Sequence, residues 1–118
     1  MNNRRIGALH EDEALRWLEK QGVKVIAKNF RCRMGEIDLI ARHEKYLLFI
    51  EVKYRKSTKA GYPAEAVTLN KQRNICKVAD YYRITNHISD SSFIRYDVVG
   101  ICDNEIRWYQ NAFDHIYR

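Results

Sequence analysis

Two apolar stretches in the middle of the chain follow the two-residue alternation of β-strands, yet both carry charged side chains. They are residues 35–40 (GEIDLI) and 47–53 (LLFIEVK), separated by a polar cluster. Alternate side chains of a strand share a face, so Glu51 and Lys53 point the same way, and Asp38 lies on the neighbouring strand. An unpaired buried carboxylate is costly. Acids and a lysine in this apolar context therefore indicate a metal or catalytic site.

The alternation also predicts which side chains form the opposite, apolar face. Glu36 shares the face of Asp38, so we expect Ile37 and Leu39 to lie together on the other side of the sheet. On the second strand the corresponding apolar residues are Leu48, Ile50 and Val52.

The rest of the pattern predicts two helices and three further strands. Apolar residues recur at helical spacing over 6–21, where Gly22 is a suitable stop, and from Ala64 or Thr68 to Arg83. The other expected elements are an edge strand at 23–30, a loop at 54–63, strands at 93–101 and 105–109 joined by a turn at 102–104, and a short helical end at 111–118. The predicted order is α-β-β-β-α-β-β, an α/β class with a mixed central sheet flanked by helices.

Glu11 stands within the apolar stripe of the first predicted helix. Ala8, Ala14, Leu15 and Leu18 follow the same helical face. A single acid in this position has a structural explanation if it lies at the edge of the stripe or pairs with an arginine. Its occurrence together with the strand acids favours a functional role.

The charge distribution adds a second indication. The chain of 118 residues, which we expect to form one domain over 1–118, has a net charge of +6. Residues 1–59 contain 14 Lys or Arg against 8 Asp or Glu, whereas residues 60–118 contain seven of each. A basic region around a few recessed acids suits a protein that binds a polyanion, although a solvated basic surface is the alternative.

Targeting signals and cysteines indicate the compartment. No apolar run approaches the ~20 residues of a membrane span, and the N-terminus has no signal-peptide core, so we expect a cytoplasmic protein. Cys32, Cys76 and Cys102 are odd in number and lack CxxC spacing, which predicts reduced thiols. The four histidines have no ligand spacing and are predicted to be surface or structural residues.

The acids and the lysine together define a candidate chemistry. If Glu11, Asp38 and Glu51 converge at one end of the sheet, their charges repel unless protons or a divalent cation compensate. Oxygen ligands of this kind suit Mg²⁺ or Mn²⁺. With Lys53 to orient the attacking water or neutralise the developing charge, the residues predict a metal-dependent nuclease. A structural ion cluster is the alternative.

The chain resembles a known family over nearly its whole length. The bacterial YraN-like family of predicted endonucleases shares the motifs GAxxExxA at 7–14, GEIDLIA at 35–41, FIEVKYR at 49–55, GYPxEAV at 61–67 with Lys71, and RYDVV at 95–99. This family is similar to the archaeal Holliday-junction resolvases and to the PD-(D/E)xK superfamily. The resemblance implies a restriction-endonuclease-like fold. One departure is Ile37, which precedes Asp38 where the superfamily's name has proline.

The resemblance implies a function and assigns roles to residues. It implies a Mg²⁺- or Mn²⁺-dependent endonuclease on structured or branched DNA, with a homodimer able to cut two strands. Catalysis would fall to Glu11, Asp38, Glu51 and Lys53, the three acids being the metal ligands. Lys71 or Gln72 on the following helix would complete the site. The expected nucleic-acid contacts are Arg33, Arg55, Lys56, Lys71 and Gln72.

Two alternatives and one unassigned residue remain at this point. In the first alternative, the chain is a non-catalytic nucleic-acid-binding module that acts as an accessory in DNA recombination, repair or uptake. Otherwise it would be a small interaction domain whose acids pair with Lys53, Arg55 or Arg95. Glu36 would be a further ligand, a group supporting the ligands, or the ion-pair partner of Arg33 or Arg55.

Overall fold

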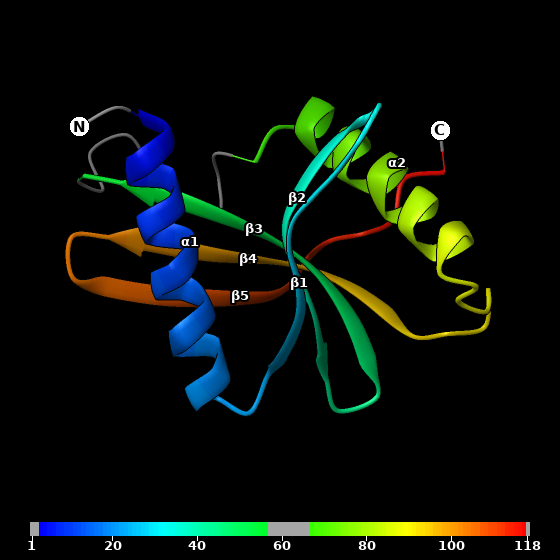
Figure 1. The fold of residues 1–118 in the computed structure, drawn as a ribbon, viewed down its shortest axis with the longest axis horizontal. Helices are drawn as coiled ribbons and strands as arrows, with labels where there is room; N and C mark the ends of the chain where they lie inside the picture. Colours follow the sequence, from blue (N-terminus) through cyan, green and yellow to red (C-terminus); the bar gives the residue numbers. More distant parts are fainter. Residues whose placement is uncertain (1–2, 57–66, 118) are drawn as a thin grey trace.

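A computed structural model of the chain describes residues 3–56 and 67–117, and Figure 1 shows their arrangement. The elements are α1 (Asn3–Lys20), β1 (Lys24–Cys32), β2 (Gly35–His43), β3 (Tyr46–Arg55), α2 (Leu69–Thr85), β4 (Ile94–Cys102) and β5 (Glu105–Phe113). The strands form one sheet in the order β1-β2-β3-β4-β5. Only the β3–β4 pair is parallel in this sheet. The predicted element order and mixed sheet are confirmed, with β1 at an edge, in agreement with the restriction-endonuclease-like fold that the resemblance implied.

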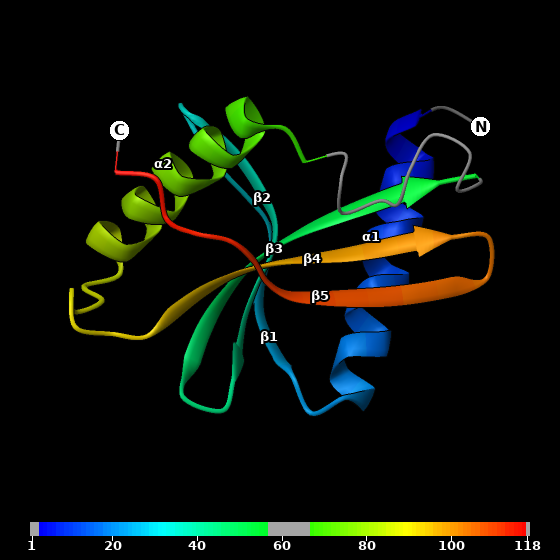
Figure 2. The ribbon, with the colours of Figure 1, turned by 180° about the vertical axis from the view of Figure 1, so that it is seen from behind.

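The two helices cover opposite faces of the sheet. In Figure 1 α1 crosses in front of the strands, and in the reverse view of Figure 2 it passes behind them. Ala14 and Leu18 of α1 pack in one apolar core, whereas Ile75, Val78 and Ala79 of α2 pack in the other. Because both faces are covered, the strand that lies in the middle of the sheet, β3, carries an unbroken apolar run rather than a polar face.

The ends of both helices follow the predicted signals. Gly22, at φ +88°, terminates α1, and the Val23 N–H donates to the Leu18 carbonyl at 3.1 Å. Leu18 and Val23 also pack in the same core, as in a Schellman motif. Thr68 caps α2, because its Oγ1 accepts a hydrogen bond from the Lys71 N–H at 3.2 Å. This cap fixes Lys71 in the first turn of α2.

The sheet separates at Asp38, and this corrects one prediction. The pairing of β2 with β3 ends at Leu39, opposite Ile50. Beyond that point the Val52 N–H donates to Asp38 Oδ2 at 2.8 Å instead of to the β2 backbone. Ile37 packs in the core under α2 and Leu39 in the core under α1, so the prediction that they share a face is wrong. The cause is the divergence of β2 from β3, visible in Figure 1 as the β1–β2 hairpin turning towards α2.

Two other predictions about irregular segments are also wrong. The tail was expected to be helical from residue 111, but β5 runs to Phe113, which pairs with Tyr96, and residues 114–117 have no regular structure. Tyr54 and Arg55 were expected in a loop, but they continue β3 because they pair with β4. The remainder of that predicted loop, at 57–63, and the predicted helix start at Ala64 lie outside the described residues.

The structure also bears on the expectations about the cysteines and about membrane spans. Cys32, Cys76 and Cys102 are free thiols, as predicted. No helix in the part of the chain that the structure describes is long and apolar enough to cross a membrane.

Candidate active site

Glu51 lies in the second half of β3, on the face that α2 covers. Its side chain is 5% exposed. The Lys71 Nζ lies 3.5 Å from Glu51 Oε2, and the Lys53 Nζ lies 4.0 Å from the same oxygen. This Oε2 atom is buried and has no hydrogen-bond partner among the described residues. Two ammonium groups thus lie near the carboxylate, but its Oε2 lacks the hydrogen bond that a buried polar atom ordinarily has.

Asp38 stands beside Glu51 because of the backbone bond that replaces the β2–β3 pairing. Its Oδ2 accepts the N–H of Val52, the residue that follows Glu51. The pKa of Glu51 is raised to about 8, chiefly by burial. Hydrogen bonding to Asp38 and the negative charge of Asp38 also raise it. Lys71 and Lys53 oppose the rise. At neutral pH Glu51 therefore holds a proton in the absence of another cation.

Glu11 approaches the same aspartate from α1. It is half-buried and lines a pocket of about 230 Å³ together with Asn29, Arg31 and Glu36. Burial, followed by the charges of Asp38 and Glu36, raises the pKa of Glu11 to about 7, while a hydrogen bond from Asn29 opposes this rise. Asp38 is therefore the group that links the acid on α1 to the acid on β3.

The helical stripe around Glu11 is only partly buried. Ala14 is fully buried, but Ala8 is exposed and lines the pocket with Glu11. Glu11 thus lies where the apolar stripe opens to solvent. This is the edge position that the sequence left open, combined with proximity to Asp38.

The remaining predicted residues separate into those near the acids and those elsewhere. Gln72 donates from Nε2 to the Val67 carbonyl at 3.1 Å, so Lys71 and not Gln72 reaches Glu51. Glu36 pairs with Arg31 at 3.1 Å. One of the three alternatives for Glu36 was an ion pair with Arg33 or Arg55, and the structure pairs it with Arg31 instead because the two residues lie opposite each other in the β1–β2 ladder.

The other expected nucleic-acid contacts lie near the ends of the strands that carry the acids. Arg33 is exposed in the β1–β2 turn, Arg55 is half-buried at the end of β3, and Lys56 is exposed immediately after it. All three positions are close in the chain to strands that carry Asp38 or Glu51.

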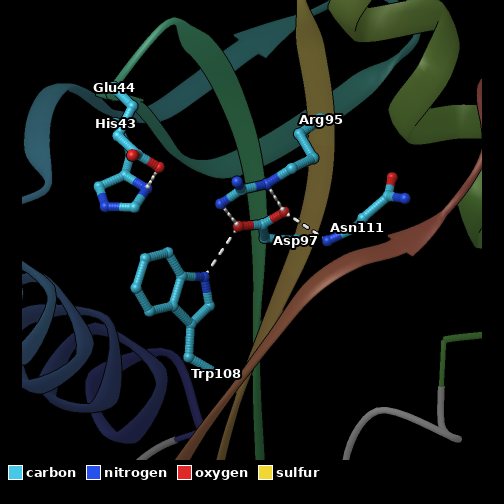
Figure 3. Close-up of polar contacts among 6 residues, drawn as sticks. All are labelled: His43, Glu44, Arg95, Asp97, Trp108 and Asn111. Carbon is cyan, nitrogen blue, oxygen red and sulfur yellow. Dashed lines mark hydrogen bonds and ion pairs between the residues drawn. The ribbon is translucent and has the colours of Figure 1, made fainter.

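Arg95 does not belong to the acid site, although one alternative paired it with the acids. Its guanidinium donates from Nε and Nη2 to the two carboxylate oxygens of Asp97, at 3.0 and 2.8 Å. Figure 3 shows that Trp108 Nε1 and the Asn111 N–H also point at this carboxylate, at 2.8 and 2.9 Å. Asp97 is fully buried, and these four donors satisfy it. Its cluster lies on the α1 side of the sheet, with Val99 and Ile101 of the same strand.

Asn29 and Arg31 are pocket residues that the sequence reasoning missed. Asn29 adopts φ +54° within β1, and asparagine is one of the few residues besides glycine that enters this region readily. An asparagine between the basic and apolar residues of a strand was the available signal. The place of Arg31 opposite Glu36 depends on the hairpin register and had no signal of its own.

The donor set can be compared with what a divalent cation requires. Over residues 3–56 and 67–117, no three His, Cys, Asp or Glu side chains are arranged to hold a metal ion by themselves. Mg²⁺, however, commonly takes one or two carboxylates and completes its shell with water and substrate phosphate. Asp38 and the unpartnered oxygen of Glu51 fit that smaller requirement. A cation bound here would replace the proton of Glu51.

The fold and site together define a class: a small α/β domain with acids and lysines gathered where two strands of a mixed sheet separate. The family model of the Uncharacterised protein family UPF0102 matches residues 10–101, and the chain belongs to this family. The family to which the sequence motifs pointed is thereby confirmed.

Relatives match over nearly their whole length. A UPF0102 protein of Lachnoclostridium phytofermentans is 46% identical over 114 residues, which cover 97% of each chain. A UPF0102 protein of Coxiella burnetii is 42% identical over 114 residues, covering 96% of this chain and 95% of the relative. A UPF0102 protein of Clostridioides difficile is 40% identical over 115 residues, covering 96% of this chain and all of the relative.

Proposed function

We propose that this protein is a divalent-metal-dependent endonuclease that hydrolyses phosphodiester bonds in structured or branched DNA. The observation that carries the proposal is Glu51, a buried strand carboxylate with an unpartnered oxygen, beside Asp38 and facing two lysines. Retaining such a group costs folding free energy. Perturbed carboxylates grouped in this way are typical of catalytic sites.

Each side chain has a role that its position supports. Asp38 and Glu51 would hold Mg²⁺ or Mn²⁺, which when bound would supply stabilisation of phosphodiester charge and activation of water. Lys53 and Lys71 place ammonium groups beside the same carboxylate, where they would attract the phosphate and stabilise negative charge in the transition state. Glu11 has a pKa of about 7 and would hold or accept a proton near neutral pH.

The charge of the surrounding chain supports a polyanionic substrate. The whole net charge of +6 arises in residues 1–59, the half that contains Glu11, Asp38 and Glu51. Arg33 and Lys56 are exposed near the strands of the site. Long-range attraction of this kind is how basic proteins collect nucleic acid before local contacts form. The preference for branched DNA rests on the resemblance to the resolvases.

The test is cleavage of a labelled four-way DNA junction with Mg²⁺ or Mn²⁺, beside linear duplex and single strand. Asp38→Asn and Glu51→Gln should each lower the rate by at least about 100-fold while remaining folded by circular dichroism. Two exposed acids provide matched controls: Asp90→Asn and Glu19→Gln should cleave at the wild-type rate.

The outcomes separate this function from its rivals. If the wild-type protein does not cleave but all variants bind the junction equally, the chain is a binding module and the nuclease proposal is wrong. If Asp38→Asn and Glu51→Gln fail to fold in the absence of metal while the controls fold, the acids are structural.

A further inference from the structure

A second polar region lies on another side of α2, against the C-terminal tail. Figures 1 and 2 show the tail running beside α2 after it leaves β5. The tail is held there because the Ile116 N–H donates to Cys76 Sγ at 3.4 Å and the Ile116 side chain packs against the core. A cavity of about 380 Å³ lies between helix and tail, lined by Arg73, Lys77, Asp80, Ile116 and Tyr117. We refer to this cavity as the α2–tail pocket.

The charges of the α2–tail pocket are unbalanced. Arg73 and Lys77 are four residues apart, so they stand one above the other on the helix surface. Within residues 3–56 and 67–117, neither makes an ion pair or a side-chain hydrogen bond. Asp80 also lines the pocket, but its carboxylate already faces His115 Nε2 at 3.4 Å. Two cations are therefore available to an anionic ligand.

The acid in the pocket is fixed by a chain of contacts that reaches into the core. His115 Nδ1 is hydrogen-bonded to the hydroxyl of Tyr96 at 2.5 Å, and the two rings stack. Tyr96 is 2% exposed. The imidazole that faces Asp80 is therefore anchored by a buried tyrosine.

An aromatic ring completes the pocket. Tyr117 is 84% exposed, and its ring meets the His115 ring edge-on with centroids 4.6 Å apart. A face of the Tyr117 ring is thus open to a ligand. Cations beside an open aromatic face form the combination that binds a nucleotide: the phosphate contacts the cations and the base stacks on the ring.

We propose that the α2–tail pocket binds one nucleotide unit of a nucleic-acid strand, with the phosphate against Arg73 and Lys77 and the base against Tyr117. This inference rests on the proposed function and adds a second contact with the substrate, separate from the acids. Lys71 and Arg73 are two residues apart and so point to nearly opposite sides of α2. Lys71 lies beside Glu51 on one side of the helix, while Arg73 lines the α2–tail pocket on the other.

The test follows backbone amide and histidine ring signals of the whole protein by NMR during titration. The probes are an eight-nucleotide single strand, dAMP and inorganic phosphate. The strand should shift the signals of Lys77, His115 and Tyr117, and Arg73→Gln with Lys77→Gln should weaken its binding at least tenfold. Tyr117→Ala should weaken the strand and dAMP but leave phosphate unchanged. Lys20→Gln with Lys24→Gln removes two exposed cations elsewhere and serves as the charge-matched control.

The results separate the possible ligands. If dAMP binds more weakly than the strand, the result supports contact with a nucleic-acid strand. If the two bind equally, the result supports binding of a free nucleotide in the same pocket. If phosphate binds as tightly as dAMP, or if the control pair loses as much affinity as the pocket pair, the proposal is wrong. An acidic peptide that shifts the same signals more tightly than the strand would also overturn it.

Failure of this inference can be distinguished from failure of the proposed nuclease. If the acids are not catalytic, the wild type does not cleave, but strand binding still depends on Arg73 and Lys77. If the α2–tail pocket is not a binding site, the pocket variants cleave the junction with unchanged KM, while Asp38→Asn still abolishes cleavage.

Discussion

Two buried carboxylates in adjacent parallel strands have opposite environments. Asp97 of β4 and Glu51 of β3 each have a cation two residues away in sequence, Arg95 and Lys53, and each is almost fully buried. Asp97 receives four hydrogen bonds, two of them from a bidentate arginine (Figure 3). Glu51 retains a buried oxygen without a hydrogen bond, and its lysine lies 4.0 Å away.

Burial of an acid therefore does not by itself define a site. A planar guanidinium can satisfy both oxygens of a carboxylate, so the Asp97 cluster is complete without a ligand. A lysine is a flexible point charge and leaves the geometry open. The Glu51 cluster has unmet hydrogen-bonding capacity and a raised pKa, and these are the properties expected where a cation or substrate is to be bound.

The largest effect should come from breaking the complete cluster. Asp97→Asn leaves the Arg95 guanidinium buried without its counter-charge, which should lower the free energy of unfolding by about 3–5 kcal/mol. Asp38→Asn keeps an oxygen for the Val52 N–H and should cost less than about 1 kcal/mol. Urea denaturation at pH 7 with EDTA measures both. Equal losses would mean that the two clusters play the same structural role.

The next effect is a gain of stability in the open cluster. The pKa of Glu51 is about 8 in the folded state against 4.5 ordinarily, so the folded protein binds a proton that the unfolded chain has lost. The stabilisation that this proton gives to the folded state is therefore complete below pH 4.5 and is lost as the pH rises to about 8. Glu51→Gln removes the penalty and should stabilise the metal-free protein at pH 8 by on the order of 2 kcal/mol, or several degrees in Tm.

The same variant behaves differently at low pH and with metal. At pH 5 Glu51 is protonated in the folded state, so Glu51→Gln should leave Tm nearly unchanged. Mg²⁺ or Mn²⁺ should raise the Tm of the wild type at pH 8 and have little effect on the variant. A variant that is less stable than the wild type at pH 8 in EDTA would show that the carboxylate stabilises the fold.

The sequence predicted the elements better than their faces. Strand alternation and helix caps were sufficient to locate the strand acids, the Gly22 stop and the Thr68 cap, since each depends on neighbouring residues. The side taken by Leu39 relative to Ile37 could not be predicted, because the divergence of β2 from β3 depends on a bond between residues 14 apart in sequence.

The C-terminal region was less predictable for the same reason. Its apolar residues suit a helix or a strand, and pairing with β4 decided in favour of a strand up to Phe113. The contact of His115 with Tyr96 spans 19 residues, and its contact with Asp80 spans a helix and two strands. A histidine with no ligand spacing therefore gave no sign of its place beside the α2–tail pocket.

The smallest effects should come from removing one donor from each cluster. Trp108→Phe deletes one of the four donors to Asp97 and should cost about 1 kcal/mol of unfolding free energy. Lys53→Met removes a partly exposed ammonium 4.0 Å from Glu51 and should change stability by less than about 0.5 kcal/mol in EDTA. It should nevertheless lower metal-dependent cleavage strongly. Chemical denaturation and the junction assay on the same preparations compare the two, and a larger stability loss for Lys53→Met than for Trp108→Phe would contradict the division between a structural and a functional cluster.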